Sequence, residues 1–335
     1  MDSALRPMSA SQVLDRTFYL YRNNFWLFAG IALITPVLTM VANLSQLWAF
    51  GIPVMMDPAK ADPQMIQRYM QDMIMRGIVG GTLGLSVYAI GYALASGATV
   101  YAVSMLHLGK NTTIAESYAK IKPMFRRILG LVLSIFFIAG WPLIASYGCF
   151  FAFALSISGM LKGGGASGPL VMLAGFLLLA AAISGALFWF FFAYCRYALA
   201  VPACTIENLP VKYSLVRSKF LVKGNMGRLV GVYLLTLVIT VALKGVLQFP
   251  AFFASGIFSM HPGGHMSPGM LLWLYSADFL GTMIAGPIAT IAMALVYYDE
   301  RVRKEAFDLQ LMMEALGQPS TAAQAASFPA SPASA

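Results

Sequence analysis

Six long apolar runs, separated by short segments that carry most of the charge, constrain this chain more than any other feature. Each run is long enough to cross the hydrocarbon core of a bilayer, which takes about 20 apolar residues. The runs predict an all-α, polytopic membrane protein with six transmembrane helices. The predicted spans cover residues 25–50, 77–106, 128–160, 169–200, 229–253 and 271–298.

Composition supports the same class of protein. Apolar residues make up 59% of the chain and charged residues 10%, whereas soluble proteins carry about 25% charged residues. The formal net charge is +9, but the basic residues lie in the short segments between the apolar runs. That placement indicates membrane topology and contact with lipid headgroups, and it disfavours binding to nucleic acid.

The distribution of Lys and Arg predicts the orientation of the chain. Four alternate segments together hold 16 of these residues, namely 1–24, 107–127, 201–228 and 299–335. The three segments between them hold 4, namely 51–76, 161–168 and 254–270. Because basic loops stay on the cytoplasmic side, we expect a multi-pass protein of the cell (inner) membrane with both termini in the cytoplasm.

Short amphipathic segments precede the odd-numbered spans. Residues 11–24, 113–127 and 209–228 each mix apolar residues at helical spacing with basic ones. Such helices commonly lie in the headgroup plane with their apolar side toward the bilayer. An interfacial helix, a span out and a span back would form one unit, and three such units would repeat along the chain. The alternative is that any six-span protein with this charge bias alternates in the same way.

Basic residues border these amphipathic segments on the predicted cytoplasmic rim. Topology alone explains a basic rim. A second explanation is a collar that binds anionic lipids, where each basic side chain near the surface contributes about 1 kcal/mol. The acidic residues Asp299, Glu300 and Glu305 are candidates to pair with this rim. The residues expected to contact anionic headgroups are Arg126, Arg127, Lys219, Lys223 and Arg228.

Two charged residues fall inside predicted spans. Lys244 lies nine residues before the end of span five at Phe253, and Asp278 lies seven residues after the start of span six at Leu271. Because the two spans are antiparallel, the depths of these residues agree within about 3 Å. Isolated charges at such depths are costly. We therefore predict a buried or water-lined ion pair; the alternative is that each side chain snorkels separately to the outer surface.

The exit of the sixth span carries a motif. From Ala289 the chain reads ATIAMALVYYDERVRKEAFDLQLMMEAL, an aliphatic run followed by Tyr-Tyr-Asp, an Arg-x-Arg-Lys-Glu stretch and an aromatic–Asp pair. This resembles the end of a bacterial and archaeal family of six-span proteins, named for the membrane domain of glycerophosphoryl diester phosphodiesterase. The motif positions are Tyr297, Tyr298, Asp299, Arg301, Arg303, Lys304, Glu305, Phe307 and Asp308.

The resemblance covers residues 9–316 and implies a membrane fold without catalysis. In the named phosphodiesterase, hydrolysis belongs to a separate soluble barrel that needs His and acidic residues around a metal, and this chain has no room for that barrel. We expect one six-span membrane domain over residues 1–316. The remaining residues, 317–335, are uncharged and rich in Ala, Ser and Pro, so a disordered tail is expected.

No arrangement of residue types in the sequence indicates catalysis. We expect no catalytic residues, no enzymatic activity, no metal site and no cofactor. His261 and His265 have an i, i+4 spacing that suits a metal only on a helix, and the Pro-Gly-Gly between them disfavours a helix.

Two functions remain open at this point. The first is a lipid-interacting or scaffolding membrane protein whose partners are membrane lipids, with anionic headgroups as the expected ones. The alternative is a transporter or lipid-translocating protein with a polar path marked by Lys244 and Asp278. A polar cavity lined by several spans would favour transport, whereas a solid apolar core would favour a scaffold.

Overall fold

The computed structural model describes residues 8–51, 63–163, 168–258 and 268–305, and within these residues all regular secondary structure is helical. The elements are α1 (Ala10–Asn23), α2 (Phe25–Ala32), α3 (Ile34–Phe50), α4 (Pro63–His107), α5 (Ile114–Ile121), a 3₁₀ turn (Lys122–Met124), α6 (Phe125–Gly163), α7 (Gly168–Tyr197), α8 (Ala200–Ile206), α9 (Val211–Val222), α10 (Met226–Phe258) and α11 (Pro268–Glu305).

Six helical segments of the described chain are long and apolar enough to cross a membrane. Each overlaps one of the six apolar runs, although the third, Ile114–Ser146, begins and ends earlier than the predicted 128–160. The fold is therefore that of a multi-pass, all-α membrane protein. The first span combines α2 and α3, and the others contain α4, α6, α7, α10 and α11. The second helix is longer than its apolar run, because α4 begins at Pro63 rather than near residue 77.

The first span is interrupted at Leu33, between α2 and α3. Pro36 lies in the first turn of α3 and has no N–H to donate to the carbonyl of Ala32, four residues earlier. Leu33 keeps helical backbone angles, φ −55° and ψ −31°. The span therefore continues through the interruption as two helices.

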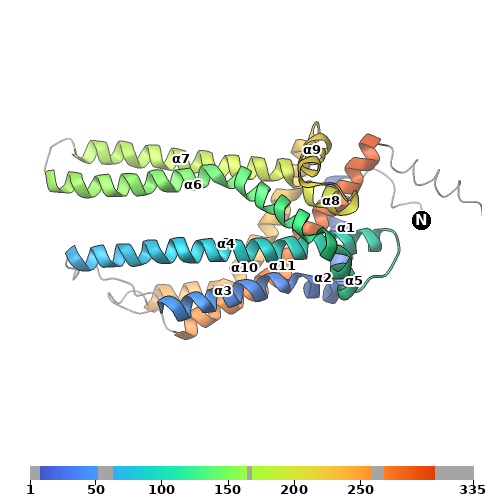
Figure 1. The fold of residues 1–335 in the computed structure, drawn as a ribbon, viewed down its shortest axis with the longest axis horizontal. Helices are drawn as coiled ribbons and strands as arrows, with labels where there is room; N and C mark the ends of the chain where they lie inside the picture. The colour runs from blue at the N-terminus through green and yellow to red at the C-terminus, as the bar shows by residue number, and fades with distance from the viewer. Residues whose placement is uncertain (1–7, 52–62, 164–167, 259–267, 306–335) are drawn as a thin grey trace, which may run out of the picture.

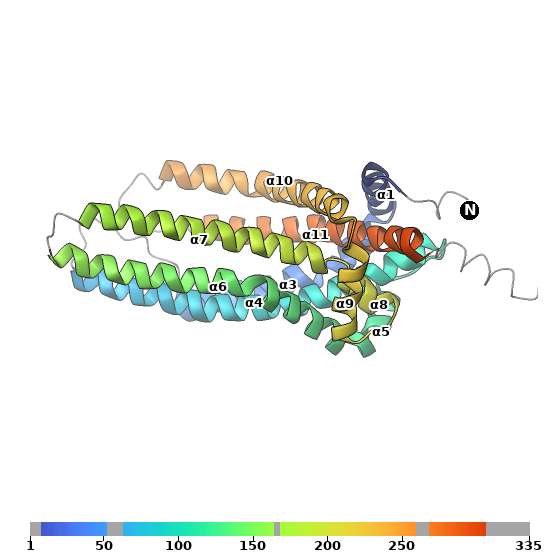
Figure 2. The ribbon, with the colours of Figure 1, turned by 90° about the horizontal axis from the view of Figure 1, so that it is seen from above.

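The long helices run along the long axis of the molecule, and short helices gather at one of its ends (Figure 1). The short helices at this end are α1, α5, α8 and α9, and a view from above places them at the same end (Figure 2). We call it the capped end. Met8 and the last turn of α11 both lie there, so the two described ends of the chain are close to the same set of short helices.

Three of the short helices correspond to the predicted amphipathic segments. In α1, Ser9 and Gln12 form a capping box, in which each side chain accepts a hydrogen bond from the other's backbone N–H. Thr113 caps α5 by accepting from the N–H of Glu116, while α9 follows Pro210 without a side-chain cap. Since α1, α5 and α9 precede the first, third and fifth spans, the order of short helix, span and span recurs three times.

The last helix, α11, is the centre of the bundle. It packs against α1, α2, α3, α4 and α10, and every residue from Ile291 to Glu300 is buried. Its span is 56% buried inside the protein, against 11% for the span that contains α7. The described part of α7 therefore turns most of its surface outward, as a lipid-facing helix does, while α11 forms the core.

Candidate functional site: a polar cavity in the bundle

Polar side chains recur at helical spacing on three of the apolar spans. On α10 they are Tyr233, Thr240 and Lys244, and on α11 they are Thr282 and Thr290. On α4 they are Tyr88, Tyr92, Ser96 and Thr99. Residues three or four positions apart lie on one face of a helix, so each span presents a polar stripe within an otherwise apolar segment.

These stripes face a common cavity. It has a volume of about 200 Å³ and is lined by α4, α7, α10 and α11, with Ala32 and Thr35 from the first span. A single buried water needs only about 10–15 Å³ of such space. The cavity therefore has room for several water molecules or for a small polar headgroup. A smaller chamber of about 40 Å³ adjoins it, shares Tyr92, Tyr194 and Tyr233 in its wall, and reaches Pro202 in α8.

A cluster of tyrosines joins the spans around the cavity. The hydroxyls of Tyr92 on α4 and Tyr194 on α7 form a hydrogen bond of 2.9 Å. The ring of Tyr194 lies 5.1 Å from that of Tyr233 on α10, and the ring of Tyr88 stacks on Tyr92 at 5.9 Å. Aromatic pairs at these separations stabilise one another. The cluster therefore brings three spans together while leaving hydroxyl groups at the cavity.

Lys244 and Asp278 meet at one side of the cavity. The Nζ of Lys244 lies 3.1 Å from the Oδ1 of Asp278 and donates a 2.7 Å hydrogen bond to the hydroxyl of Thr282. The side chains are 31% and 40% exposed, and Lys244 lines the cavity. The contact follows from the matched depths of the two residues on antiparallel spans. The contact is only partly buried, and Lys244 is the member of the pair that faces the cavity.

Gly281 makes room for this contact. A Cβ atom at position 281 would lie 2.8 Å from the Cγ of Lys244 and 3.6 Å from its Cα. Contacts below 3.0 Å between carbon atoms are repulsive, so a larger residue at 281 would displace the stem of the lysine. The glycine lets α10 approach α11 where the two charges must meet.

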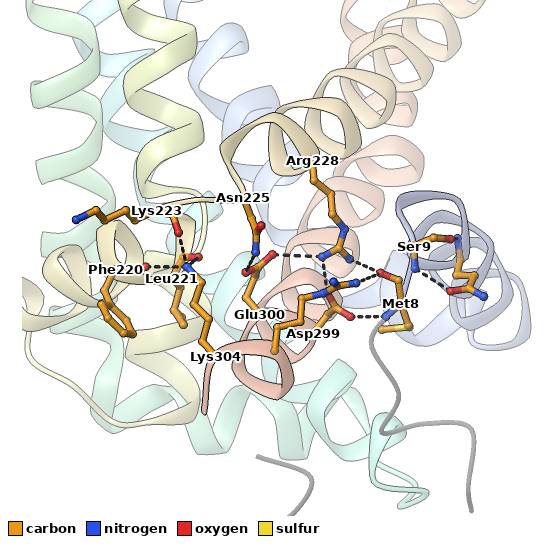
Figure 3. Close-up of polar contacts among 12 residues, drawn as sticks. Met8, Ser9, Phe220, Leu221, Lys223, Asn225, Arg228, Asp299, Glu300 and Lys304 are labelled. Carbon is orange, nitrogen blue, oxygen red and sulfur yellow. Dashed lines mark hydrogen bonds and ion pairs between the residues drawn. The ribbon is translucent and has the colours of Figure 1, made fainter. Parts of the chain in front are cut away.

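A different arrangement of charges holds the capped end, and Figure 3 shows part of it. Asp299 and Glu300 on α11 are buried, with side chains 0% and 2% exposed. Arg228 on α10 bridges both carboxylates, and Arg303 donates to Asp299 at 2.8 Å. The amide of Asn225 donates to Glu300 at 2.8 Å. We call these residues the Asp299 cluster.

The Asp299 cluster also holds the start of the chain. The backbone N–H of Met8 donates to Asp299 at 2.5 Å. Its carbonyl accepts a hydrogen bond of 2.7 Å from Arg228 (Figure 3) and another of 2.7 Å from Arg303. The segment that leads into α1 is therefore fixed to spans five and six by backbone contacts.

A second group of charges, the Glu207 cluster, lies beside α8 and α9. Arg217 donates three hydrogen bonds to Glu207, at 2.8, 3.0 and 3.2 Å, and one to Glu305 at 2.8 Å. Arg301 lies 3.2 Å from Glu305, and the hydroxyl of Tyr297 donates to Glu207. Burial lowers the pKa of Arg217, but its hydrogen bonds to Glu305 and Glu207 outweigh burial and raise that pKa above its ordinary value. Arg217 therefore stays charged.

Lys304 completes the capped end by binding backbone carbonyls. Its Nζ donates to Phe220 at 3.0 Å and to Leu221 and Lys223 at 2.6 Å, all at the end of α9 (Figure 3). The last carbonyls of a helix have no partner within the helix, and a lysine at that position satisfies them. Lys304 therefore ties α9 to the final turn of α11.

The residues predicted to contact headgroups lie in different environments. Arg126 and Lys223 have exposed side chains. Arg127 is exposed and donates to the side chain of Asn208 at 3.1 Å, and the ammonium of Lys219 lies 5.3 Å from the ring centre of Tyr197. Arg228 differs from this expectation, because protein carboxylates and the Met8 carbonyl occupy its guanidinium. We therefore leave Arg228 out of the headgroup set.

Other predictions fall elsewhere or outside the described residues. Tyr298 is buried and stacks on His107 at 5.0 Å, so it has a packing role at the capped end. Asp308, the pair His261 and His265, and the tail over 317–335 all lie outside the residues that the structure describes. Within the described ranges, no three His, Cys, Asp or Glu side chains are grouped so that they could hold a metal ion.

Comparison with protein-family models, with curated proteins and with solved structures found no match for this chain. The resemblance to the phosphodiesterase membrane domain therefore stays a prediction.

The sequence pattern predicts the contact of Lys244 with Asp278 at one side of the cavity. It does not single out the tyrosines or the threonines of the wall. A signal was present, because Tyr233, Thr240 and Lys244 follow one another at steps of seven and four residues on one span. Polar residues at helical spacing inside an apolar span mark a face that does not contact lipid.

Proposed function

We propose that this protein is a non-enzymatic integral membrane protein that binds the polar headgroup of a membrane lipid inside its helix bundle. The observation that supports it best is the 200 Å³ cavity, whose wall combines hydroxyls from α4, α7, α10 and α11 with Lys244. Membrane proteins rarely place so many polar groups within their spans unless a ligand or a path requires them. A purely scaffolding bundle would fill this space with apolar side chains.

The hydroxyls in the cavity wall are costly to remove from water. Moving a hydroxyl out of water without a partner costs about 1–3 kcal/mol by protein mutational data. Several hydroxyls of the cavity have intrahelical or tyrosine partners, yet they retain further hydrogen-bonding capacity. A headgroup that uses this capacity offsets the cost, and apolar chains of the lipid can remain among the spans.

The proposal includes an orientation and a second lipid contact. We place the protein in the cell (inner) membrane with both termini and the capped end in the cytoplasm, as the basic segments predict. Arg126, Arg127, Lys219 and Lys223 would then contact anionic headgroups at that surface. A reporter fused after Ala335 should be active in the cytoplasm, and one inserted in the loop over 261–268 should be active outside. The reverse pattern would overturn the orientation.

The headgroup proposal is tested by native mass spectrometry. The protein is purified in an oligoethylene-glycol detergent, which carries no sugar or phosphate, and the lipids that remain bound are counted. The double variant Tyr92→Phe/Tyr194→Phe keeps both rings and removes two cavity hydroxyls. A hydrogen bond contributes about 1 kcal/mol, so retained lipid should fall about fivefold.

A matched control uses a tyrosine outside the cavity. Tyr213 on α9 is 66% exposed, and Tyr213→Phe should retain as much lipid as the wild-type protein. Thermal unfolding verifies that each variant is folded. Equal lipid retention by the wild type, the double variant and the control would reject a headgroup site in the cavity.

A second candidate function, lipid translocation, has its own support. The polar stripe from Tyr233 to Lys244 spans eleven residues, or about 16 Å, which is about half of the 30 Å hydrocarbon core. A path of that length would carry a headgroup part of the way across the membrane. Liposomes with a fluorescent lipid in both leaflets test it: faster exchange with the wild-type protein than with the double tyrosine variant supports translocation, and equal rates reject it.

A further inference from the structure

We propose that the cavity takes an uncharged, hydroxyl-rich headgroup, such as the sugar or glycerol of a neutral lipid, and that Asp278 sets this selectivity by neutralising Lys244. The inference rests on the proposed function, because it names the chemistry of the ligand in the same cavity. Three observations carry it: the charge balance of the pair, the direction of the hydroxyl hydrogen bonds, and the tyrosine rings in the wall.

The charge balance argues against an anionic headgroup. Among the residues that line the described cavity, Lys244 is the one that carries a charge. The carboxylate of Asp278 lies 3.1 Å from its Nζ. The pair has no net charge. An anion that approached Lys244 would also approach Asp278, and the like-charge repulsion would cancel much of the attraction. A neutral headgroup meets no such opposition.

The hydrogen-bond directions favour a ligand that can donate. The hydroxyl of Thr240 donates to the carbonyl of Thr236 at 2.8 Å, and that of Ser96 donates to Ala93 at the longer 3.5 Å. Their oxygens can still accept hydrogen bonds, but their protons are in use. Phosphate diester oxygens only accept, so they would meet acceptors here. A polyol offers a donor and an acceptor at each hydroxyl and matches both kinds of group.

Donors for the ligand's own oxygens are also present. Lys244 has three N–H groups, of which Asp278 and Thr282 accept two. The hydroxyl of Thr282 accepts from Lys244 and keeps its own proton. Tyr92 and Tyr194 share one hydrogen bond, and Tyr233 lies beside Tyr194. A row of these three hydroxyls uses at most two of its protons, so at least one is left for the ligand. The wall thus offers donors and acceptors side by side.

The tyrosine rings suit the carbon skeleton of a polyol. Tyr88 and Tyr92 are stacked on α4, and Tyr194 and Tyr233 lie against each other across α7 and α10. A sugar has apolar C–H faces and polar edges, so it can pack a face on a tyrosine ring while its hydroxyls reach the threonines. The same chemistry fits a lipid-borne sugar or glycerol and a free polyol, and the test separates these two sources.

The test compares lipids with identical acyl chains. Native mass spectrometry in an oligoethylene-glycol detergent measures retention from an equimolar mixture of monoglucosyl diacylglycerol, phosphatidylglycerol and diacylglycerol. Phosphatidylglycerol carries a glycerol headgroup together with a charged phosphate, so it isolates the effect of charge. Phosphatidylglycerol can also bind the basic rim, so the cavity is read from the retention that is lost in Tyr92→Phe/Tyr194→Phe. We expect this loss to be largest for the glucolipid. Free glucose is added in a second arm: displacement of the glucolipid by glucose would identify a soluble polyol as a ligand of the same chemistry.

Asp278→Asn gives the decisive variant, because it leaves Lys244 charged and removes its neutralising partner. One charge-assisted hydrogen bond to phosphate should then shift the ratio of phosphatidylglycerol to glucolipid by about tenfold. The matched control is Asp72→Asn, which removes the carboxylate from another ion pair, Asp72 with Arg76, whose atoms lie 2.6 Å apart on α4. Asp72 is outside the cavity wall, so the control should keep the wild-type ratio.

A second variant covers the case in which Asp278→Asn does not fold. Lys244→Gln/Asp278→Asn has no charge at either position, so it should retain less lipid in total but keep the preference for the glucolipid. A wild-type preference for phosphatidylglycerol that depends on Tyr92 and Tyr194 would overturn this inference while leaving the headgroup site intact. Retention that does not depend on those tyrosines for any lipid would overturn both proposals.

Discussion

The cavity and the capped end differ in how their polar groups are buried and paired, although α11 contributes to both. At the capped end, Asp299 and Glu300 have nearly no exposed surface, and arginine, asparagine and backbone groups surround them. At the cavity, Lys244 and Asp278 are 31% and 40% exposed, and Lys244 lines the open volume. The charged groups at the capped end therefore hold helices together. The polar groups at the cavity keep hydrogen-bonding capacity that a ligand can use.

The difference also appears in what each region joins. The Asp299 cluster connects the start of the chain with spans five and six, and the Glu207 cluster connects α8 and α9 with α11. Both fix helices relative to one another. The tyrosines of the cavity join spans two, four and five through one hydroxyl contact and ring packing, which leaves the remaining hydroxyl capacity available to a ligand. Four predictions test this contrast.

The largest effect is expected from Arg228→Met. The substitution removes the bridge between Asp299 and Glu300 and leaves two buried carboxylates with fewer partners. Breaking a buried ion pair from one side typically costs about 3–5 kcal/mol. Thermal or denaturant unfolding in detergent measures the loss. Arg126→Met is the control, because Arg126 is exposed. If both variants lose the same small amount, the Asp299 cluster does not hold the capped end together.

A moderate effect is expected at the cavity pair. Lys244→Met and Asp278→Asn each leave one charge uncompensated, while the double variant leaves none. Because the pair is partly exposed, we expect a coupling of about 1 kcal/mol in a double-mutant cycle on unfolding free energy. Strict additivity of the two single effects would show that the charges do not interact. A coupling as large as the loss of unfolding free energy expected for Arg228→Met would remove the contrast between the two regions.

A smaller effect is expected from Gly281→Ala. The new Cβ would meet the Cγ of Lys244 at 2.8 Å, so the lysine must shift away from Asp278, at a cost of about 1 kcal/mol. Gly245→Ala on α10 is the matched control, because a Cβ there has nothing within 4 Å. Unfolding midpoints of the two variants are compared. A midpoint for Gly281→Ala at or above that of Gly245→Ala would argue against a tight approach at this point.

The smallest effect on stability is expected at the exposed rim. Changing Arg126, Arg127, Lys219 and Lys223 together to Gln should alter unfolding free energy by less than about 0.5 kcal/mol per site. Retention of anionic lipids should fall, because each basic side chain near the membrane surface contributes about 1 kcal/mol. Native mass spectrometry with phosphatidylglycerol provides the measurement. Unchanged retention would leave membrane topology as the sole explanation of these residues.

The sequence was sufficient for the spans and for one contact, and physical reasons explain both. Apolar length is a local property, so the six runs could be counted directly. The contact between Lys244 and Asp278 followed from depth, because a short loop between antiparallel spans fixes their relative height. The interruption at Leu33 also had a local cause in Pro36, although a proline in a span does not reveal whether the helix bends or stops.

The other contacts depend on how the helices pack, which local patterns do not determine. Tyr92 and Tyr194 are 102 residues apart, and nothing near either residue indicates that α4 and α7 are neighbours. Arg228 and Lys223 look alike in the sequence, as basic residues beside an amphipathic segment. Only the position of Asp299, 71 residues further along the chain, distinguishes the arginine that is held in an ion pair from the lysine that is exposed.

The central place of α11 has a consequence for biosynthesis, because this helix leaves the ribosome after the other five described spans. Until it is inserted, span five enters the membrane with Lys244 and without Asp278, and Arg228 has neither of its carboxylate partners. The first five spans therefore cannot complete the core or fix Met8 during translation. The contacts of α11 with the rest of the bundle form only after the sixth span arrives, so Lys244 and Arg228 lack these carboxylate partners until then.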